Sequence, residues 1–458
     1  MSDASGFDEA DEFEEAGDTV YRALLSRVGE GSPRRRLDPT RRVLELLGDP
    51  QAAYPVIQLT GTNGKTSTSR MIESILRAYG LRTGLFTSPH LQRFNERIAI
   101  DGAPISNQAL AANWADIEPY VAMVDDELTE RGEQRLTFFE VLAVLAFASF
   151  ADAPVDVAVV EVGMGGEWDS TNVADAQVAV FTPIDLDHTS VLGSTTAEIA
   201  RTKAGIIKPA ATVVTAAQRP DAMAEIERAA AMTESSIVRY GTDFRLVRDV
   251  VAVGGQQITV KGLAGEYREM YLPLYGDHQG ENASVAIAAV ETFLGAGTTA
   301  LADDILEEGL AEVRSPGRLQ LIGTDPTVLV DSAHNPHGAR SLVAALNAYF
   351  DVDEVGLVIG VLGDKDAAGI FDVLAPIAAR VYLTRPDSDR ALDIDALADA
   401  ASPSLDAARV STHDDVADAL DAAREWAAED ERRMVVVAGS VLLAGEAMTI
   451  AEDRGWMR

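Results

Sequence analysis

The segment Val56-Ile-Gln-Leu-Thr-Gly-Thr-Asn-Gly-Lys-Thr-Ser67 decides the fold of this chain. Its first five residues suit a buried strand, residues 61–64 form a glycine-rich turn, and residues 65–79 have the periodicity of a helix. Glycines let backbone N–H groups converge on phosphate oxygens, the helix N-terminus adds positive potential, and a lysine supplies a point charge. The segment therefore predicts a phosphate-binding loop. Its expected nucleotide contacts are Gly61, Thr62, Asn63, Gly64, Lys65, Thr66 and Ser67, with Lys65 at the β- and γ-phosphates.

This loop is shorter than the usual Walker pattern, because only Thr62 and Asn63 separate Gly61 from the Gly64-Lys65 pair. The alternative interpretation is a glycine-rich turn followed by a chance lysine. Its position directly after a strand favours the phosphate loop. So does the scarcity of lysine, which occurs only at positions 65, 203, 208, 261 and 365.

Strand and helix patterns alternate after the loop. Helical patterns at 138–150 and 197–204 alternate with strand patterns at 155–162 and 178–182, which indicates a doubly wound, mainly parallel sheet. Short β-like runs between 237 and 273 predict an antiparallel addition to this domain.

The segment Arg314-Ser-Pro-Gly-Arg318 has the composition of a linker, and strand patterns resume after it. We therefore expect a P-loop-containing α/β domain over residues 18–313 and a second, smaller, Rossmann-like α/β domain over 314–458. Residues 1–17 are rich in acids and are predicted to form a disordered tail. Helices are expected at 19–28 and 39–47.

The composition limits the classes of partner. Acidic residues number 73 and basic residues 38, a formal net charge of −35, so binding to nucleic acid or to anionic membranes is not expected. The absence of cysteine excludes disulfides, thiolate metal sites and a cysteine nucleophile. The longest apolar runs, 141–150 and 434–445, are shorter than the roughly 20 residues that span a bilayer, and residues 1–18 do not resemble a signal peptide. We predict a cytoplasmic protein with an acidic, lysine-poor, salt-adapted (halophilic) surface.

Three polar segments fall at or just beyond predicted strand ends and contain Ser88, Glu161 and His188. In an open α/β sheet, ligands bind outside the carboxyl ends of the strands, so these residues are expected to meet at one site. A carboxylate, a hydroxyl and nucleotide phosphates suit Mg²⁺, whereas histidine is a less common ligand. Taken singly, each could instead be a strand-end cap or a histidine satisfied in the core. Their joint placement favours a site.

Two further segments carry candidate contacts. Asp331-Ser-Ala-His-Asn-Pro336 directly follows an apolar strand, and the alternative interpretation is a simple turn. Lys203 and Lys208 follow a predicted helix, and either could be a surface lysine whose stem lies along apolar neighbours.

Taken together, these segments resemble the folylpolyglutamate synthase/dihydrofolate synthase family of the Mur ligase superfamily, from about Tyr21 to the last helix. The most specific is Ser88-Pro-His-Leu-Gln-Arg-Phe-Asn-Glu-Arg-Ile98, which is not expected in the peptidoglycan ligases. The other matching segments are 137–140, 161–172, 187–188, 203–208, 276–279, 316–318 and 331–336. Two positions depart from the family pattern: Thr66, where glycine is usual and which is similar to the Mur ligases, and Ser332, where glycine is common.

The resemblance implies an activity. The chain is expected to be an ATP-dependent ligase that adds L-glutamate to dihydropteroate, to a tetrahydrofolate polyglutamate, or to both, through an acyl phosphate. Residues 18–313 would be the Mur ligase-like ATP-binding domain and 314–458 the glutamate ligase domain, in a protein expected to be a monomer. One alternative is a Mur-type ligase acting on another carboxylate, and residues 88–98 disfavour it. The other is a nucleotide-binding switch or scaffold, which Asp331 and His334 disfavour.

The resemblance also implies residue roles. Ser88, Glu161 and His188 match magnesium ligands, and two Mg²⁺ ions are expected. Lys203 matches a lysine that is carbamylated in many relatives, and a carbamate offers oxygen ligands that an ammonium cannot. The matching nucleotide contacts are Asn282, Arg318, Asp331 and His334. The expected catalytic residues are Lys65, Lys203 and His334, the last of which would orient phosphate or glutamate.

Overall fold

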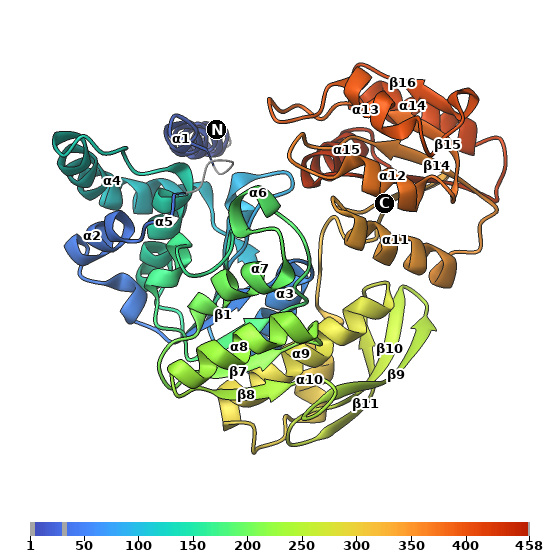
Figure 1. The fold of residues 1–458 in the computed structure, drawn as a ribbon. Helices are drawn as coiled ribbons and strands as arrows, with labels where there is room; N and C mark the ends of the chain where they lie inside the picture. Colours follow the sequence, from blue (N-terminus) through green and yellow to red (C-terminus); the bar gives the residue numbers. More distant parts are fainter. Residues whose placement is uncertain (1–4, 30–33, 457–458) are drawn as a thin grey trace.

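Two β-sheets, one in each half of the chain, organise the fold (Figure 1). The computed structural model describes residues 5–29 and 34–456, with side chains described from residue 14 onward. The first sheet has eight strands in the order β4-β3-β2-β5-β1-β6-β7-β8. The second has six strands in the order β12-β13-β17-β14-β15-β16.

The first sheet is mainly parallel. Strands β2, β5, β1, β6, β7 and β8 run parallel, whereas β3 and β4 form an antiparallel edge. This order confirms the predicted doubly wound sheet. The strands are β1 (Val56–Thr60), β2 (Thr83–Phe86), β3 (Ile98–Ile100), β4 (Ala103–Pro104), β5 (Val157–Glu161), β6 (Val178–Phe181), β7 (Thr212–Thr215) and β8 (Ser236–Arg239).

Helices cover both faces of this sheet because successive strand residues point to opposite sides. Ile57 and Leu59 of β1 face one core, and Val56 faces the other. The first core lies under α3 (Lys65–Ala78), α9 (Asp277–Gly295) and α10 (Asp303–Ala311). The opposite face carries α2 (Asp38–Leu46), α4 (Asn107–Glu130), α5 (Phe138–Asp152), α7 (Thr196–Lys203) and α8 (Pro220–Met232).

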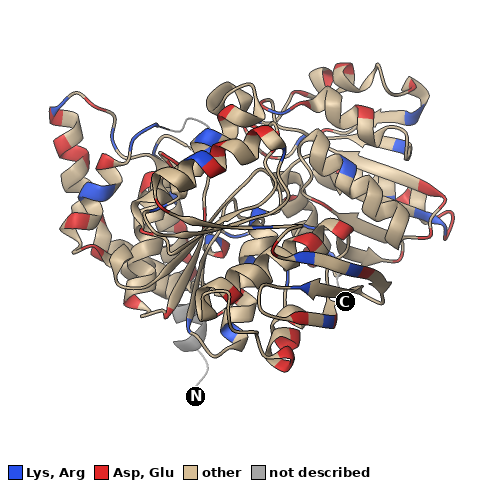
Figure 2. Ribbon diagram, turned by 60° about the horizontal axis from the view of Figure 1, so that its bottom comes forward, with Lys and Arg blue, Asp and Glu red and all other residues tan. Residues whose placement is uncertain are grey.

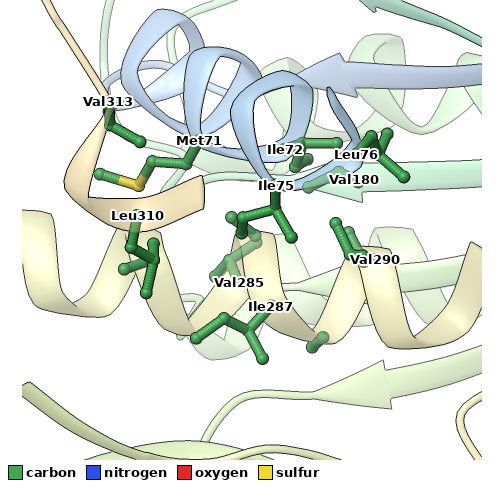
Figure 3. Packing of buried hydrophobic residues seen from close by; sticks show 14 of the residues in the cluster. Met71, Ile72, Ile75, Leu76, Val180, Val285, Ile287, Val290, Leu310 and Val313 are labelled. Carbon is green, nitrogen blue, oxygen red and sulfur yellow. The ribbon is translucent and has the colours of Figure 1, made fainter. Parts of the chain in front are cut away.

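The contact between α3 and α9 holds the helix of the phosphate loop in place. Figure 3 shows Ile75 of α3 beside Val285 of α9, with Ile287 on the opposite side of α9, and all three side chains are fully buried or nearly so. Ile287→Ala is therefore expected to lower the free energy of unfolding by about 2–5 kcal/mol, through lost apolar contact and the cavity left behind. The measurement is the shift of the urea midpoint followed by circular dichroism. Met232→Ala, at a position 74% exposed on α8, is the control and should shift the midpoint little. Equal shifts for the two variants would contradict the prediction.

The second sheet is also mainly parallel, with only β12 antiparallel to its neighbour. Its strands are β12 (Gln320–Thr324), β13 (Thr327–Val330), β14 (Glu354–Ile359), β15 (Ala378–Leu383), β16 (Val410–Thr412) and β17 (Arg433–Ala438). One face carries α11 (Pro336–Tyr349), α12 (Ala367–Leu374) and α13 (Ile394–Ala401), and the other α14 (Val416–Ala427) and α15 (Val441–Asp453). A second α/β unit is thus present after residue 319, as the sequence predicted.

The antiparallel addition is a three-stranded sheet of β9 (Arg245–Ala252), β10 (Gly255–Lys261) and β11 (Glu266–Leu272). The predicted range of 237–273 began too early, because β8 pairs in parallel with β7 and belongs to the first sheet.

The N-terminal segment differs from its prediction. Helix α1 spans Ser5–Leu25, so residues 5–17 are helical where a disordered acidic tail was expected. Val20 and Leu24, one turn apart, are buried in the core with α4 and α5, and this packing supports the helix. The helix expected at 19–28 is thus present as the end of α1, whereas the prediction for residues 5–17, which rested on local charge, was wrong. Residues 1–4 lie outside the described residues.

Acidic residues are spread over the molecule rather than gathered in one segment. Figure 2 shows Asp and Glu on helices and loops throughout both α/β units. Within the described residues, every helix is too short or too polar to cross a bilayer.

Candidate active site

The phosphate loop joins β1 to α3 and needs glycine at both ends. Gly61 and Gly64 have φ of +152° and +85°, in the region that favours glycine. A Cβ on Gly61 would lie 1.9 Å from Thr182 Oγ1, and one on Gly64 would lie 2.7 Å from Asn282 Oδ1. The loop is therefore pressed between the end of β6 and helix α9.

Lys65 is the first residue of α3, and its side chain folds back over the loop. Its Nζ donates to the carbonyl oxygens of Gly61 and Thr62, at 3.2 and 3.3 Å. Burial lowers its pKa, while the nearby carboxylates of Glu161 and Asp187 act in the opposite direction. Two neutral carbonyls satisfy this ammonium only partly, so a phosphate oxygen would be a stronger partner.

Glu161 ends β5 directly opposite the loop and is only 1% exposed. The hydroxyl of Thr66 donates to both of its carboxylate oxygens, at 3.0 and 2.9 Å. Burial raises the pKa of Glu161, and the charge of Lys65 opposes that shift. Ser88, which follows β2, lies beside it and donates its backbone N–H to the carboxylate. A bound cation here would lower the cost of burying the carboxylate.

His188 lies in the loop after β6 and adopts a left-handed conformation, with φ of +49°. Non-glycine residues seldom adopt this conformation, and such strain is common at functional sites. Burial lowers the pKa of His188 to about 4, against the effect of the neighbouring Asp187 carboxylate. The imidazole is therefore neutral at pH 7 and keeps a nitrogen lone pair for a ligand.

Lys203 reaches the same site from the end of α7. It is 4% exposed, and its Nζ donates to the Gly61 carbonyl oxygen at 2.7 Å. Burial lowers the pKa of Lys203 to about 7, and the nearby charge of Lys65 acts in the same direction. Lys208 is arranged differently, because its Nζ donates to the backbone oxygen of Asn172 at 2.8 Å.

The second domain contributes Asp331 and His334 from the loop after β13. The Asp331 carboxylate accepts the backbone N–H groups of Leu319 and Ala333, at 2.9 and 2.8 Å, and so joins the linker to this loop. His334 Nδ1 lies 2.9 Å from the Ser332 carbonyl oxygen, which makes Nδ1 the protonated nitrogen. Its Nε2 lies 3.7 Å from Asp187 Oδ2.

One cavity between the domains is lined by all fifteen residues predicted as nucleotide contacts, metal ligands or catalytic residues, and Lys208 lies outside it. It has about 1130 Å³ of space, part of it open to solvent. Such a volume accommodates a nucleotide and a second substrate. The lining combines the cationic Lys65, Lys203 and Arg318 with the carboxylates of Glu161, Asp187 and Asp331, and therefore suits an anion bound together with a cation.

Comparison with known proteins agrees with this geometry. Residues 59–290 match the Mur ligase middle domain, and residues 317–441 match the Mur ligase glutamate ligase domain. A dihydrofolate synthase/folylpolyglutamate synthase of Mycobacterium tuberculosis is 44% identical over 443 residues, which is 91% of each protein. The chain belongs to the folylpolyglutamate synthase/dihydrofolate synthase family. The family resemblance seen in the sequence is thereby confirmed.

Solved structures of this family share the fold. Mycobacterium tuberculosis folylpolyglutamate synthase complexed with ADP has a TM-score of 0.92 and 43% identity, covering 96% of this chain and 99% of that one. Escherichia coli FolC in complex with DHPP and ADP has a TM-score of 0.82 and 31% identity, covering 95% and 98%. The two-domain α/β architecture is therefore that of the synthase family.

A metal in this synthase site would have a mixed set of ligands. Among the described residues, no three His, Cys, Asp or Glu side chains are grouped so as to hold a cation on their own. Glu161, Ser88 and His188 nevertheless line one cavity beside the phosphate loop. These three side chains would leave coordination positions open for phosphate oxygens. Mg²⁺ at nucleotide sites is usually bound by a few protein groups together with phosphate oxygens.

Contacts between the domains involve residues that the sequence did not single out. Asn63 of the loop accepts from Asn335 Nδ2 at 3.2 Å, and its own Nδ2 lies 2.9 Å from His337 Nδ1. Lys365 Nζ lies 2.8 Å from Asp187 Oδ1. Lys365 is one of five lysines and follows strand β14, which is the signal that could have identified it.

The Lys365–Asp187 pair is expected to hold the domains together. The two side chains are only 7% and 11% exposed, so Lys365→Met would leave a buried carboxylate without its cation. We expect the equilibrium to shift about tenfold or more toward an open form, measured as a larger radius of gyration by X-ray scattering. Arg390→Met, which breaks a half-exposed pair with Asp364 inside the second domain, should leave the radius unchanged. An unchanged radius of gyration for Lys365→Met would show that this pair does not hold the domains together.

Proposed function

We propose that this protein is an ATP-dependent ligase that joins L-glutamate to a folate-type carboxylate. The observation that carries the proposal is the single cavity in which the phosphate loop, Glu161, Asp331 and His334 face one another across the two domains. The names of the family members and the ADP and DHPP in their complexes support ATP and a folate-type substrate. The match over residues 317–441 supports glutamate as the amino acid.

The reaction begins with activation of a carboxylate. A folate carboxylate oxygen attacks the γ-phosphorus of ATP, the bond to the β-phosphate oxygen breaks, and an acyl phosphate and ADP form. The loop N–H groups and Lys65 neutralise charge on the transferring phosphoryl group and fix its position. No protein nucleophile is required.

The second step forms the amide. The amine of glutamate attacks the acyl carbon, phosphate leaves with the bonding electrons, and the amine loses a proton. Contacts from the second domain to Asn63 close the cavity over the loop and limit access of water to the acyl phosphate. His334, with Nδ1–H fixed by Ser332, would present Nε2 to phosphate or glutamate.

We infer that Ser88, Glu161 and His188 hold Mg²⁺, with two ions in the complete site. When bound, the metal supplies charge neutralisation at the phosphate oxygens. Glu161 stays ionised beside such a cation, and the neutral His188 offers its lone pair.

We infer that Lys203 is carbamylated. Its lowered pKa leaves a large neutral fraction of the amine near pH 7, and only the neutral amine adds carbon dioxide. A carbamate keeps one N–H that can donate to the Gly61 carbonyl oxygen, and it adds a carboxylate beside the metal ligands.

The remaining nucleotide contacts are proposed from position. Asn282 touches Gly64 of the loop, and Arg318 and Asp331 reach the cavity from the linker and the second domain. These residues would bind the nucleotide as the domains close.

We propose that the functional units are residues 18–313 and 314–458, in a cytoplasmic monomer adapted to high salt. The charge of −35 and the scarcity of lysine support salt adaptation, and they also disfavour nucleic acid and membrane partners.

The deciding experiment is ADP release in high salt with ATP, Mg²⁺ and L-glutamate. Dihydropteroate, tetrahydrofolate and no acceptor are compared. Stimulation by dihydropteroate alone identifies a dihydrofolate synthase, by tetrahydrofolate alone a folylpolyglutamate synthase, and by both a bifunctional enzyme. If neither acceptor stimulates release, the proposal of a folate substrate fails, and a Mur-type ligase for another carboxylate takes its place.

A further inference from the structure

A second, smaller cavity opens beside the first, between helix α3 and the second domain. It has about 390 Å³ of space, part of it open to solvent, and shares Thr66, Pro89 and Arg318 with the main cavity. Val441 of α15 also lines both cavities, whereas Arg70 of α3 lines only the smaller one. The cavity therefore connects with the site of phosphoryl transfer and is completed only when the two domains meet.

The Arg70 side chain lines this smaller cavity and has no hydrogen-bond or ion-pair partner among the described residues. It lies one helical turn beyond Thr66, on the same side of α3. Its Nε is buried and has no hydrogen-bond acceptor, and no ion pair joins Arg70 to any carboxylate within the described residues. Arg318 is a second guanidinium close enough to repel it. Two neighbouring guanidiniums in one cavity favour an anion between them.

The carboxylates nearest to Arg70 are bonded elsewhere. Their charges act on it, but each is a hydrogen-bond acceptor for other groups. These are Glu96, bonded to the backbone N–H groups of residues 91–93 at 2.7–3.0 Å, Glu161, bonded to the Thr66 hydroxyl, and Glu73, bonded to the Thr83 hydroxyl at 2.6 Å. The donors of Arg70 thus remain available to a ligand.

We propose that Arg70 binds a carboxylate of the incoming L-glutamate, beside Arg318 on the nucleotide side of the cavity. The inference rests on the proposed ligase function, which requires a dicarboxylic amino acid next to the acyl phosphate. Arg70 lies one helical turn beyond Thr66 and does not line the main cavity, which the phosphate loop faces, so it is not placed to bind the nucleotide phosphates. A guanidinium binds a carboxylate through two parallel hydrogen bonds, which fixes both its position and its orientation. The amine of the amino acid can then extend into the main cavity.

The test is the steady-state kinetics of Arg70→Met, which keeps length and removes charge. We expect the KM for glutamate to rise about 10- to 100-fold, because charge-assisted hydrogen bonds are lost, and the KM for ATP to change less than about twofold. Arg77→Met is the matched control, since Arg77 lies two turns further along the same helix and is paired with Glu73 and Glu312. It should leave the KM for glutamate unchanged.

Glutamate analogues provide a second, independent comparison. The α-amide and the γ-amide of glutamate each lack one carboxylate charge, and the unmodified enzyme should discriminate strongly against one of them. In Arg70→Met, the kcat/KM for the same analogue should be much closer to the kcat/KM for glutamate. The reason is that the amide analogue and the Arg70 substitution each remove the same interaction. Full additivity of the two changes would overturn the assignment.

The outcomes separate this inference from the proposed function. If the unmodified protein shows no glutamate-dependent ADP release, the ligase function itself fails. If release is normal but folded Arg70→Met keeps its KM for glutamate, Arg70 does not bind the amino acid. An equal rise in the KM for ATP would assign Arg70 to the nucleotide instead. If the methionine variant does not fold, the same KM values are measured for Arg70→Lys, which keeps the charge but lacks the planar guanidinium.

Discussion

Replacing Lys65 by methionine is expected to lower kcat for glutamate-dependent ADP release by about a thousandfold. Its partly buried ammonium lies at the first turn of α3 and donates to two loop carbonyls, for which a γ-phosphoryl oxygen would be a stronger substitute. Removal of one preorganised charge or donor from such a site typically costs about 100- to 1000-fold in kcat. The measurement is a coupled ADP assay at saturating substrates.

Lys261→Met is the control, because Lys261 is exposed at the end of β10. It should retain full activity, and both proteins should unfold at the same urea concentration. Activity within about tenfold of normal in folded Lys65→Met would contradict the assignment of this lysine to the phosphates.

Lys203→Met is expected to lower kcat by about 100-fold or more, because a carbamate beside the metal ligands would be lost. The pKa of about 7 sets the direction of the pH effect. Below pH 7 the ammonium predominates and does not add carbon dioxide, whereas above pH 7 the neutral amine predominates. Bicarbonate should therefore restore the activity of carbon dioxide-depleted enzyme more strongly at pH 8 than at pH 6.

Two observations check this prediction besides activity. Labelled bicarbonate should give a carbamate signal by ¹³C NMR in the unmodified protein and in Lys208→Met, and none in Lys203→Met. Lys208 is the matched control because its side chain is also largely buried, at 15% exposed, but bonds to Asn172 instead. A signal that survives in Lys203→Met would show that a different amine is modified.

The sequence predicted the phosphate loop and its neighbours well, for a physical reason. The carboxyl ends of parallel strands meet at one edge of a sheet, so motifs after β1, β2, β5 and β6 converge whatever their spacing along the chain. The predicted residues do line one cavity, although their individual roles remain predictions.

Contacts that depend on the docking of two domains were not visible in the sequence. Three such contacts join segments that lie far apart along the chain. They are the contacts of Asn335 and His337 with Asn63, the pair of Lys365 and Asp187, and the placement of Arg70 beside Arg318 in one cavity. No local periodicity encodes such pairings. The end of α1 was predicted as a helix, but its first part, residues 5–17, was missed because that prediction rested on acidic composition alone.

The contact of Asn335 and His337 with the phosphate loop bears on how a polymer could be extended. A separation of the domains would move these side chains away from Asn63 and widen the path by which the nucleotide exchanges. During that interval the elongated product is also free to diffuse away. If the proposed ligase adds more than one glutamate, release of the product in that interval would make chain growth distributive rather than processive.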